Sequence, residues 1–217
     1  MEFINSKIQD YAEQHTAKEP AWLYELNRYT HSSQLKPRML SGHLQGRFLS
    51  MISHLMQPAY VLDIGTYTAY SALCLAEGLN SGGHLYTIDN NDETMAVAER
   101  FIAASGYSER ITCVTGDALH EIHRLNTVVP YWDIVWMDAD KSEYIRYYEL
   151  CIDKMKPGGL ILADNVLWSG KVLDRGELAK DQDTAVLHAF NEMVSKDERV
   201  ESVLLPIRDG IMMLRKR

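Results

Sequence analysis

From residue 59 onward, short apolar runs alternate with segments of helical periodicity, and this alternation restricts the fold more than any other feature of the chain. Each apolar run has the length of one buried strand, and the runs cover residues 59–64, 84–89, 111–116, 132–138 and 158–164. Helical patterns separate them around residues 69–79, 92–105, 117–125 and 142–155. Strands that alternate with helices of this length form βαβ units, so the sequence predicts an α/β fold with a doubly wound sheet.

The carboxyl-terminal part departs from this alternation. A helical pattern over residues 183–195 precedes two apolar runs, residues 199–207 and 210–216, which meet at the tight turn Arg208-Asp209-Gly210. A tight turn between two strands favours an antiparallel hairpin. We therefore expect a seven-stranded, mostly parallel sheet whose last two strands form an antiparallel hairpin at its edge.

The first 56 residues carry helical patterns instead of strands. Apolar residues recur at helical spacing twice, first in Ile4, Ile8, Tyr11 and Ala12 and then in Trp22, Leu23 and Leu26. Ser41 is expected to cap a third helix, whose predicted apolar face is Leu44, Phe48, Met51, Ile52 and Leu55. We predict a single domain over residues 1–217, in which a helical cap (1–56) precedes a Rossmann-like core (57–217).

Composition and charge count against several kinds of protein. No apolar run approaches the ~20 residues that span a bilayer, and the first residues lack the apolar stretch of a secretory signal. A net charge of −8 disfavours a nucleic-acid partner. Cys74, Cys113 and Cys151 are odd in number and lie in apolar stretches, which is typical of unpaired thiols in a reducing compartment. We expect a cytoplasmic protein without a membrane or nucleic-acid partner.

The turn after the first predicted strand is a candidate nucleotide site. In doubly wound sheets this turn holds a nucleotide-like ligand, and Gly65 would let the backbone approach it closely. Asp89 ends the second predicted strand, where it could accept hydrogen bonds from ribose hydroxyls or cap the next helix. The turn lacks the glycine pattern of dinucleotide sites. Asp63 would repel a pyrophosphate but tolerate a sulfonium, which favours S-adenosylmethionine over NAD.

Three oxygen donors follow two neighbouring strands of the predicted sheet. Asp138 ends the fourth strand, and Asp164 and Asn165 end the fifth. Because carboxyl ends of parallel strands face one crevice, these side chains are expected to converge beside the cofactor. All-oxygen ligation suits a hard cation, Mg²⁺ first, with Mn²⁺ or Ca²⁺ as substitutes. The alternative is that these residues cap later helices. Asp140, with Ser142, is expected to be such a cap.

At these residues the chain resembles the cation-dependent O-methyltransferases, which include catechol O-methyltransferase, caffeoyl-coenzyme A O-methyltransferase and small bacterial relatives. The resemblance covers roughly residues 35–217. It rests on Met39 to Gly46, VLDIGTYTAYS, TIDNND, GDAL at 116–119, DADKSEY, KPGGLILADNVLWSGKV and DGIMML. The pair DADK and ADNVLW is the most specific element and is closer to the caffeoyl-coenzyme A and bacterial branch. The resemblance implies a class I methyltransferase fold.

The resemblance also implies roles for individual residues. It makes Asp138, Asp164 and Asn165 the metal ligands and Lys141 the general base, which would also contact the acceptor. It places Trp168 near the acceptor. The positions expected at S-adenosylmethionine are Met39, Ser41, Gly65, Tyr67, Ser71, Asp89, Ala118 and Asp138, and Asp63 joins them because its charge suits the sulfonium. A homodimer is also implied, with the stripes around 22–26 and 48–55 as contributors.

Two features depart from the family. Ala69 stands where the family usually has a second glycine; because alanine suits a helix start, we expect weaker cofactor binding at most. The irregular stretch 165–182 has the length of a functional lid but no basic cluster to grip coenzyme A phosphates. Lys171 or Arg175 in this stretch could meet an acceptor carboxylate, or could be solvated surface charges.

The predicted function is metal-dependent methyl transfer from S-adenosylmethionine to a catechol-type vicinal diol, such as caffeate or protocatechuate. A bound dication would lower the pKa of a phenol and bias Lys141 toward its neutral amine. The alternatives are a tRNA hydroxyuridine methyltransferase of the same family, an NAD-linked oxidoreductase and a non-catalytic binding module. The sequence leaves open the natural acceptor, the choice between meta and para oxygens, and the metal used.

Overall fold

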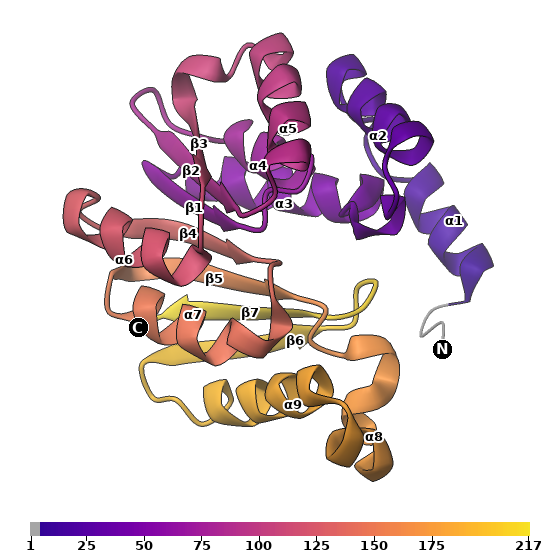
Figure 1. The fold of residues 1–217 in the computed structure, drawn as a ribbon, viewed down its shortest axis with the longest axis vertical. Coiled ribbons are helices and arrows are strands. Elements are labelled where there is room, and N and C mark those ends of the chain that lie inside the picture. The colour runs from indigo at the N-terminus through magenta and orange to yellow at the C-terminus, as the bar shows by residue number, and fades with distance from the viewer. Residues whose placement is uncertain (1–4) are drawn as a thin grey trace.

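The computed structural model describes residues 5–217, and a seven-stranded sheet forms its centre (Figure 1). Its strands are β1 (Tyr60–Ile64), β2 (His84–Asp89), β3 (Ile111–Thr115), β4 (Trp132–Met137), β5 (Met155–Asp164), β6 (Val200–Leu205) and β7 (Ile211–Lys216). They lie in the order β3-β2-β1-β4-β5-β7-β6. Strands β1 to β5 pair in parallel, whereas β7 runs antiparallel to both β5 and β6. The predicted fold class is confirmed, including the carboxyl-terminal hairpin.

Helices cover both faces of this sheet (Figure 1). The α-helices are α1 (Ser6–Gln14), α2 (Ala21–Ser33), α3 (Gly42–Met56), α4 (Tyr70–Ala76), α5 (Asp92–Ser105), α6 (Ala118–Val128), α7 (Tyr144–Ile152), α8 (Arg175–Lys180) and α9 (Gln182–Val194). Short 3-10 turns are η1 (Pro37–Met39), η2 (Ser108–Arg110), η3 (Lys141–Glu143) and η4 (Trp168–Leu173).

Two apolar clusters, one on each face, hold the layers together. Strand β4 is buried along its whole length, and its side chains alternate between them. Val135 and Met137 join the cluster formed with α6, α7 and α9. Ile134 and Trp136 join the cluster formed with α2 to α5. This double burial explains why the central strands read as continuous apolar runs rather than alternating ones.

The predicted apolar face of α3 is wrong in part, because Phe48 and Ile52 pack against the core while other members of that face do not. The helix buries Gln45, Leu49 and Ser53, while Met51 and Leu55 are 61% and 76% exposed. Small residues face the sheet side because α3 packs closely on α4: a Cβ on Gly46 would collide with the Tyr70 ring. The Ser41 side chain also makes no capping hydrogen bond within the described chain, contrary to the prediction.

Met51 and Leu55 of α3 are exposed and remain candidates for a dimer contact. Leu23 and Leu26 of α2 are fully buried within the chain. The homodimer itself stays a prediction. Ile4, the first residue of the pattern predicted for α1, lies outside the described residues. Ile8 and Tyr11 of that pattern are more than half exposed.

The segment 165–182 is more regular than predicted. It forms η4 and α8, and the Asp174 carboxylate caps α8 by accepting hydrogen bonds from the N–H groups of Gly176 and Glu177. Asp181 caps α9 in the same way, through the N–H of Asp183. The expectation of one long irregular loop is wrong because these two aspartates each start a new helix.

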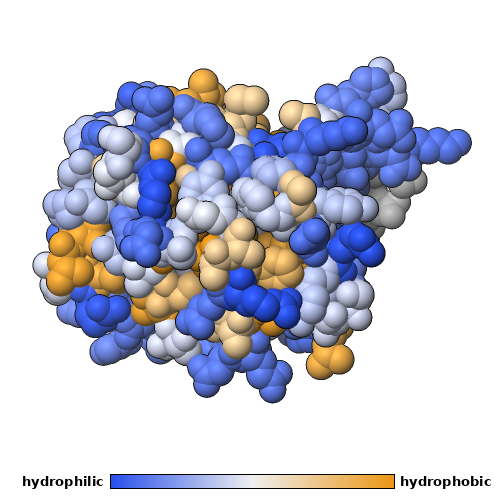
Figure 2. All heavy atoms as spheres, turned by 90° about the horizontal axis from the view of Figure 1, so that it is seen from above, coloured by the Kyte–Doolittle hydropathy of each residue, from blue (hydrophilic) through white to orange (hydrophobic). Residues whose placement is uncertain are grey.

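Two further expectations concern membrane-spanning segments and the thiols. Seen from above, the surface is mostly hydrophilic with scattered hydrophobic side chains (Figure 2). Among the helices of residues 5–217, none combines the length and the apolar character that a membrane crossing requires. Cys74, Cys113 and Cys151 are all free, which confirms unpaired thiols.

Candidate active site

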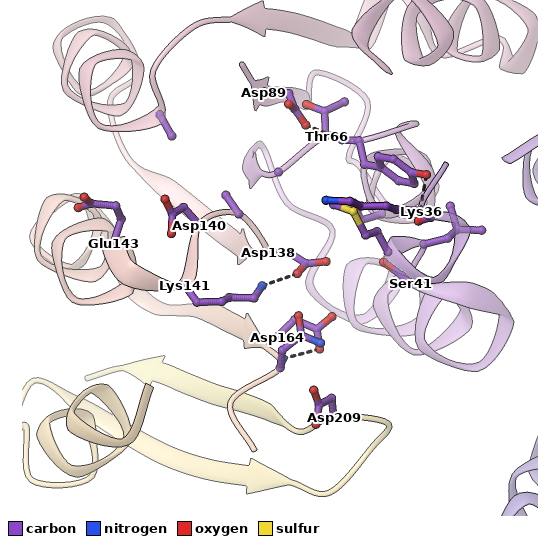
Figure 3. Close-up of a pocket in the computed structure, with 18 of the residues that line it drawn as sticks. Lys36, Ser41, Thr66, Asp89, Asp138, Asp140, Lys141, Glu143, Asp164 and Asp209 are labelled. Atoms are coloured by element: carbon purple, nitrogen blue, oxygen red, sulfur yellow. Dashed lines mark hydrogen bonds and ion pairs between the residues drawn. The ribbon is translucent and has the colours of Figure 1, made fainter. Parts of the chain in front are cut away.

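A cavity of about 1010 Å³ opens at the carboxyl ends of the parallel strands. It lies at the point between β1 and β4 where the strand order reverses, and ligands of doubly wound sheets bind at such a point. Asp89, Asp138 and Asp164 reach it from the ends of β2, β4 and β5 (Figure 3). The predicted site residues that line it are Met39, Ser41, Gly65, Tyr67, Ser71, Asp89, Ala118, Asp138, Lys141, Asp164, Asn165 and Trp168.

The turn after β1 brings backbone groups close to the cavity. Gly65 has φ +107°, and a Cβ there would lie 2.7 Å from the carbonyl carbon of Asp138. Its N–H donates to the Ile88 carbonyl at 2.9 Å, and the Asp138 N–H donates to the Ile64 carbonyl at 2.8 Å. These bonds lock the ends of β1, β2 and β4 together, so only glycine fits at position 65.

Asp89 fixes the shape of this turn. One carboxylate oxygen accepts the N–H of Tyr67 at 2.7 Å, and the other accepts the N–H of Asn91 at 3.0 Å. Tyr67 has φ +47°, an unusual conformation that the first bond holds. Asn91, rather than Asp89, caps α5 through the N–H groups of Glu93 and Thr94. Asp89 is therefore free of the capping role and faces the cavity.

Asp63 lies beneath the cavity rather than in its wall. Its side chain is fully buried and accepts hydrogen bonds from the hydroxyls of Ser71, at 3.0 Å, and Thr87. Burial raises the pKa of Asp63 to about 7, although both hydroxyls oppose the shift. Ser71 lines the cavity, so Asp63 acts on a ligand only through Ser71 or through its charge.

Lys141 and Tyr144 connect the ends of β4 and β5. The Lys141 ammonium donates to Asp138 Oδ1 at 2.7 Å and to the Tyr144 hydroxyl at 2.8 Å. Tyr144 is fully buried, and its hydroxyl lies 3.0 Å from the carbonyl oxygens of Met137 and Asp164, to which it donates. Tyr144 thus braces both strand ends behind the lysine.

Lys141 is an ammonium in this arrangement. Burial lowers its pKa, but Asp138, Tyr144 and Asp164 raise it more, so the net pKa lies above the usual lysine value. The sequence predicted a bias toward the neutral amine beside a dication. That bias stays a prediction, and in the structure the ammonium is paired with Asp138 (Figure 3).

Asp164 is a buried carboxylate beside a second one. It is 3% exposed, and burial and the neighbouring Asp138 raise its pKa. Oδ1 accepts the N–H of Asn165 at 2.8 Å, and Oδ2 accepts the side-chain amide of Gln45 at 2.6 Å. Burial and the negative charge of Asp138 make ionisation of Asp164 unfavourable, and the Lys141 ammonium offsets this effect only in part.

The donors at this corner of the cavity are two carboxylates and one amide. Within residues 5–217, no three side chains of the His, Cys, Asp and Glu types are grouped so that they could hold a metal ion. Asp138, Asp164 and Asn165 nevertheless line the cavity together, and Asn165 has φ +60°. As predicted from Asp140 and Ser142, Asp140 caps η3 through the Ser142 N–H.

A segment of the amino-terminal helices forms the opposite wall. The cavity is lined beside the β1 turn by Lys36, Arg38, Met39, Leu40 and Ser41 (Figure 3). The Tyr67 hydroxyl donates to the Lys36 carbonyl at 3.2 Å, and Arg208 donates to the Leu40 carbonyl at 2.9 Å. Met39 is 53% exposed and Ser41 is buried. This segment is thereby tied to both the turn after β1 and the β6–β7 turn.

The two basic residues considered for an acceptor carboxylate differ. Lys171 lines the cavity, but its ammonium lies 3.0 Å from Asp181 and 3.3 Å from Glu177. Arg175 is exposed at the start of α8, away from the cavity lining. Trp168 lines the cavity, and its indole N–H donates to Asp181 at 3.4 Å.

The sequence reasoning missed several residues at the site, and Gln45, Arg208 and Tyr144 are the ones whose contacts reach Asp164 or Lys141. Gln45 was hidden among the apolar positions of α3, and Arg208 was assigned only to a turn. Tyr144 ends the DADKSEY motif, whose spacing from Lys141 could have signalled a contact because residues three apart in a helical turn are neighbours.

The chain matches the sequence model of the O-methyltransferase family over residues 13–217. This chain belongs to the O-methyltransferase family. A caffeoyl-CoA O-methyltransferase of Petroselinum crispum is 31% identical over 208 residues, which cover 92% of this chain and 85% of that relative. The predicted resemblance and the predicted enzyme class are both confirmed, against an NAD-linked oxidoreductase or a non-catalytic module.

Solved structures agree with the fold of this O-methyltransferase. An O-methyltransferase from Bacillus cereus, in complex with S-adenosylhomocysteine, has a TM-score of 0.90 and 25% identity, with 97% of each chain covered. The methyltransferase PaMTH1 of Podospora anserina, also bound to S-adenosylhomocysteine, has a TM-score of 0.88 and 24% identity, with 98% of this chain and 94% of that chain covered. The second likeness concerns the fold alone.

Proposed function

We propose that this O-methyltransferase transfers the methyl group of S-adenosylmethionine to one oxygen of a catechol-type acceptor, beside a divalent cation. The observation that carries the proposal is the pair Asp138 and Asp164, two carboxylates on one cavity, the second only 3% exposed. The cavity adjoins the glycine turn at which doubly wound folds bind nucleotides.

S-adenosylmethionine as methyl donor is supported by the Bacillus cereus relative, which was solved with the demethylated product of that cofactor. On this chain, Asp89 is placed to accept ribose hydroxyls, and Gly65 lets the backbone reach the ligand. The remaining proposed contacts are Met39, Ser41, Tyr67, Ser71, Ala118 and Asp138, with Asp63 acting from below.

The residues present fit a hard divalent cation. Asp138, Asp164 and Asn165 would hold it through oxygen atoms, which suits Mg²⁺, Mn²⁺ or Ca²⁺. Burial and the charge of Asp138 raise the pKa of Asp164, so a cation bound between these carboxylates would favour the ionised form of Asp164. When bound, such an ion supplies a Lewis acid that lowers the pKa of a phenolic hydroxyl.

Lys141 is proposed to accept the phenolic proton at Nζ. Its amine is already at the metal corner of the cavity, held by the Tyr144 hydroxyl at 2.8 Å. In this state the amine is protonated and paired with Asp138, so Lys141 becomes a base only after that pair is broken. The hydrogen bond from the Lys141 amine to the Tyr144 hydroxyl would then keep the neutral amine in place. Holding the two reactants in line would contribute most of the acceleration.

The acceptor is proposed to be a vicinal diol without a required anionic group. Trp168 would cover the ring as one wall of the cavity. The positive charge of Lys171 is already balanced by Asp181 and Glu177, and Arg175 lies away from the cavity. Neither residue therefore offers an unpaired cation at the cavity, so catechol and protocatechuate are expected to be methylated at similar rates.

A methyl-transfer assay with catechol and S-adenosylmethionine tests this function. Activity should vanish in EDTA and return on addition of Mg²⁺ or Mn²⁺, and phenol should not replace catechol. Discrimination should be large because a monophenol loses the orientation that two bound oxygens provide. Full activity in EDTA would overturn the metal requirement, and equal rates on phenol and catechol would overturn the diol.

A further inference from the structure

Gln45 places a neutral amide against the buried carboxylate of Asp164. Gln45 lies on α3 and is fully buried, 119 residues before Asp164 in the chain. Its Nε2 donates to Asp164 Oδ2 at 2.6 Å. Through this side chain, helix α3 contacts one of the proposed metal ligands.

The orientation of this amide is set by both of its neighbours. The Gln45 carbonyl oxygen accepts from the Arg208 guanidinium at 3.3 Å. A guanidinium can only donate and an ionised carboxylate can only accept, so a flipped amide would face a wrong partner on both sides. Arg208 is anchored in turn, because the same nitrogen donates to the Leu40 carbonyl at 2.9 Å.

We propose that Gln45 is a positioning residue for the metal ligand Asp164. Its hydrogen bond, together with that from the Asn165 N–H, occupies one acceptor site on each carboxylate oxygen. The carboxylate is thereby fixed in one orientation before a cation arrives. Because Gln45 is neutral, it does this without the repulsion that a lysine or arginine would exert on the cation. This inference rests on the proposed metal dependence.

The closing experiment measures Mn²⁺ binding to the free enzyme by electron paramagnetic resonance, without cofactor or acceptor. Gln45→Met removes the donor at nearly the same volume. We expect its Mn²⁺ dissociation constant to rise about 10–100-fold, as for other residues that orient metal ligands. S-adenosylhomocysteine binding, measured by calorimetry, should be unchanged.

Ser53→Ala is the matched control. Ser53 is also fully buried on α3, and its hydroxyl donates to the Leu75 carbonyl, away from the cavity. Gln45→Met loses its hydrogen bonds with Asp164 and Arg208, and Ser53→Ala loses one buried hydrogen bond of the same helix. Ser53→Ala should nevertheless bind Mn²⁺ as tightly as the wild type. Thermal unfolding reports that both are folded. Should Gln45→Met fail to fold, Gln45→Asn shortens the donor while it keeps the amide, and the same weakening is expected.

The outcomes separate this inference from the proposed function. If the wild type binds Mn²⁺ and folded Gln45→Met binds it equally well, the positioning role is overturned while the metal site stands. If Ser53→Ala weakens Mn²⁺ as much as Gln45→Met, the effect belongs to α3 as a whole and the role of Gln45 is likewise overturned. If the wild type binds no Mn²⁺, the metal site itself fails.

Discussion

The two halves of the cavity are built in different ways. The half at β1 and β2 is shaped by backbone: Gly65 lies where a side chain would collide with Asp138, and the Tyr67 N–H is pinned by Asp89. The half at β4 and β5 is made of buried charge, with Lys141 and Asp164 less than a tenth exposed. Ligand binding at β1 and β2 depends on the backbone conformation of the turn. Ligand binding at β4 and β5 depends on how the ligand compensates the buried charges.

This difference predicts two kinds of sensitivity. In the backbone half, adding a methyl group should damage folding and binding together, because shape and stability depend on the same atoms. In the charged half, removing a side chain should damage chemistry while it leaves the fold intact. Functional charges are commonly kept at some cost to stability, so their loss need not unfold the chain.

Gly65→Ala should have the largest effect. Its Cβ would meet the carbonyl group and backbone of Asp138, in a conformation that alanine avoids. We expect a loss of roughly 2–6 kcal/mol in the free energy of unfolding, from strain and overpacking of about 1–3 kcal/mol each. Urea unfolding measures it, and S-adenosylhomocysteine binding should be lost in parallel. A variant of normal stability and affinity would contradict the backbone model.

Asp164→Ala and Lys141→Met test the charged half as a pair. Asp164→Ala should abolish Mn²⁺ binding yet retain S-adenosylhomocysteine. Lys141→Met should retain both ligands and slow turnover by about 10²–10⁴-fold, as expected for loss of a general base. Calorimetry and steady-state kinetics separate the two. Equal loss of Mn²⁺ binding in both variants would remove the distinction between ligand and base.

Sequence patterns predicted the sheet because the parallel strands are buried on both faces and read as apolar runs. They also placed Asp138, Asp164 and Asn165 at one edge, since strand ends converge by topology alone. They failed on α3, where close packing selects Gly46 and Ser53 instead of large apolar residues. Gln45 could not be found this way because its partner lies 119 residues away and the contact exists only after folding.

The variant Asp63→Asn tests whether a negative charge at the β1–β2 half of the cavity contributes to cofactor binding. Asp63 has a pKa of about 7, so at pH 8 it is ionised beneath the cavity. A cationic sulfonium should feel this charge and the neutral S-adenosylhomocysteine should not. We expect the preference for S-adenosylmethionine over S-adenosylhomocysteine to fall by on the order of 1 kcal/mol in the variant, at an effective dielectric constant near 20.

The same charge fixes the pH dependence of this comparison. Below pH 7 the Asp63 carboxyl takes up a proton, so the wild type should come to resemble the variant. Because its pKa is raised in the folded chain, the contribution of Asp63 to stability falls as the pH rises from about 4 through 7. Asp63→Asn should lose this part of the pH dependence. A ratio of affinities that is the same in both proteins at pH 8 would exclude the charge effect.

Ala69→Gly should have the smallest effect. Ala69 has φ +72° and is fully buried, so it is not in helical conformation and its methyl group does not line the cavity. The expectation that helix propensity explains its tolerance is therefore wrong, and cofactor affinity should not change in the variant. Glycine would relieve about 1–2 kcal/mol of left-handed strain. It would lose a similar amount through chain entropy of about 0.4–1 kcal/mol and one buried methyl of about 0.8 kcal/mol.

Ala72→Gly is the matched control, because Ala72 is equally buried in α4 but lies within the helix. There glycine relieves no strain, so it should cost about 1–2 kcal/mol more than Ala69→Gly in the free energy of unfolding. Urea unfolding of the two variants measures the difference directly. Equal losses would show that the left-handed backbone at position 69 carries no strain. Alanine at position 69 would then have to be explained in another way than by strain that is offset by chain entropy and methyl burial.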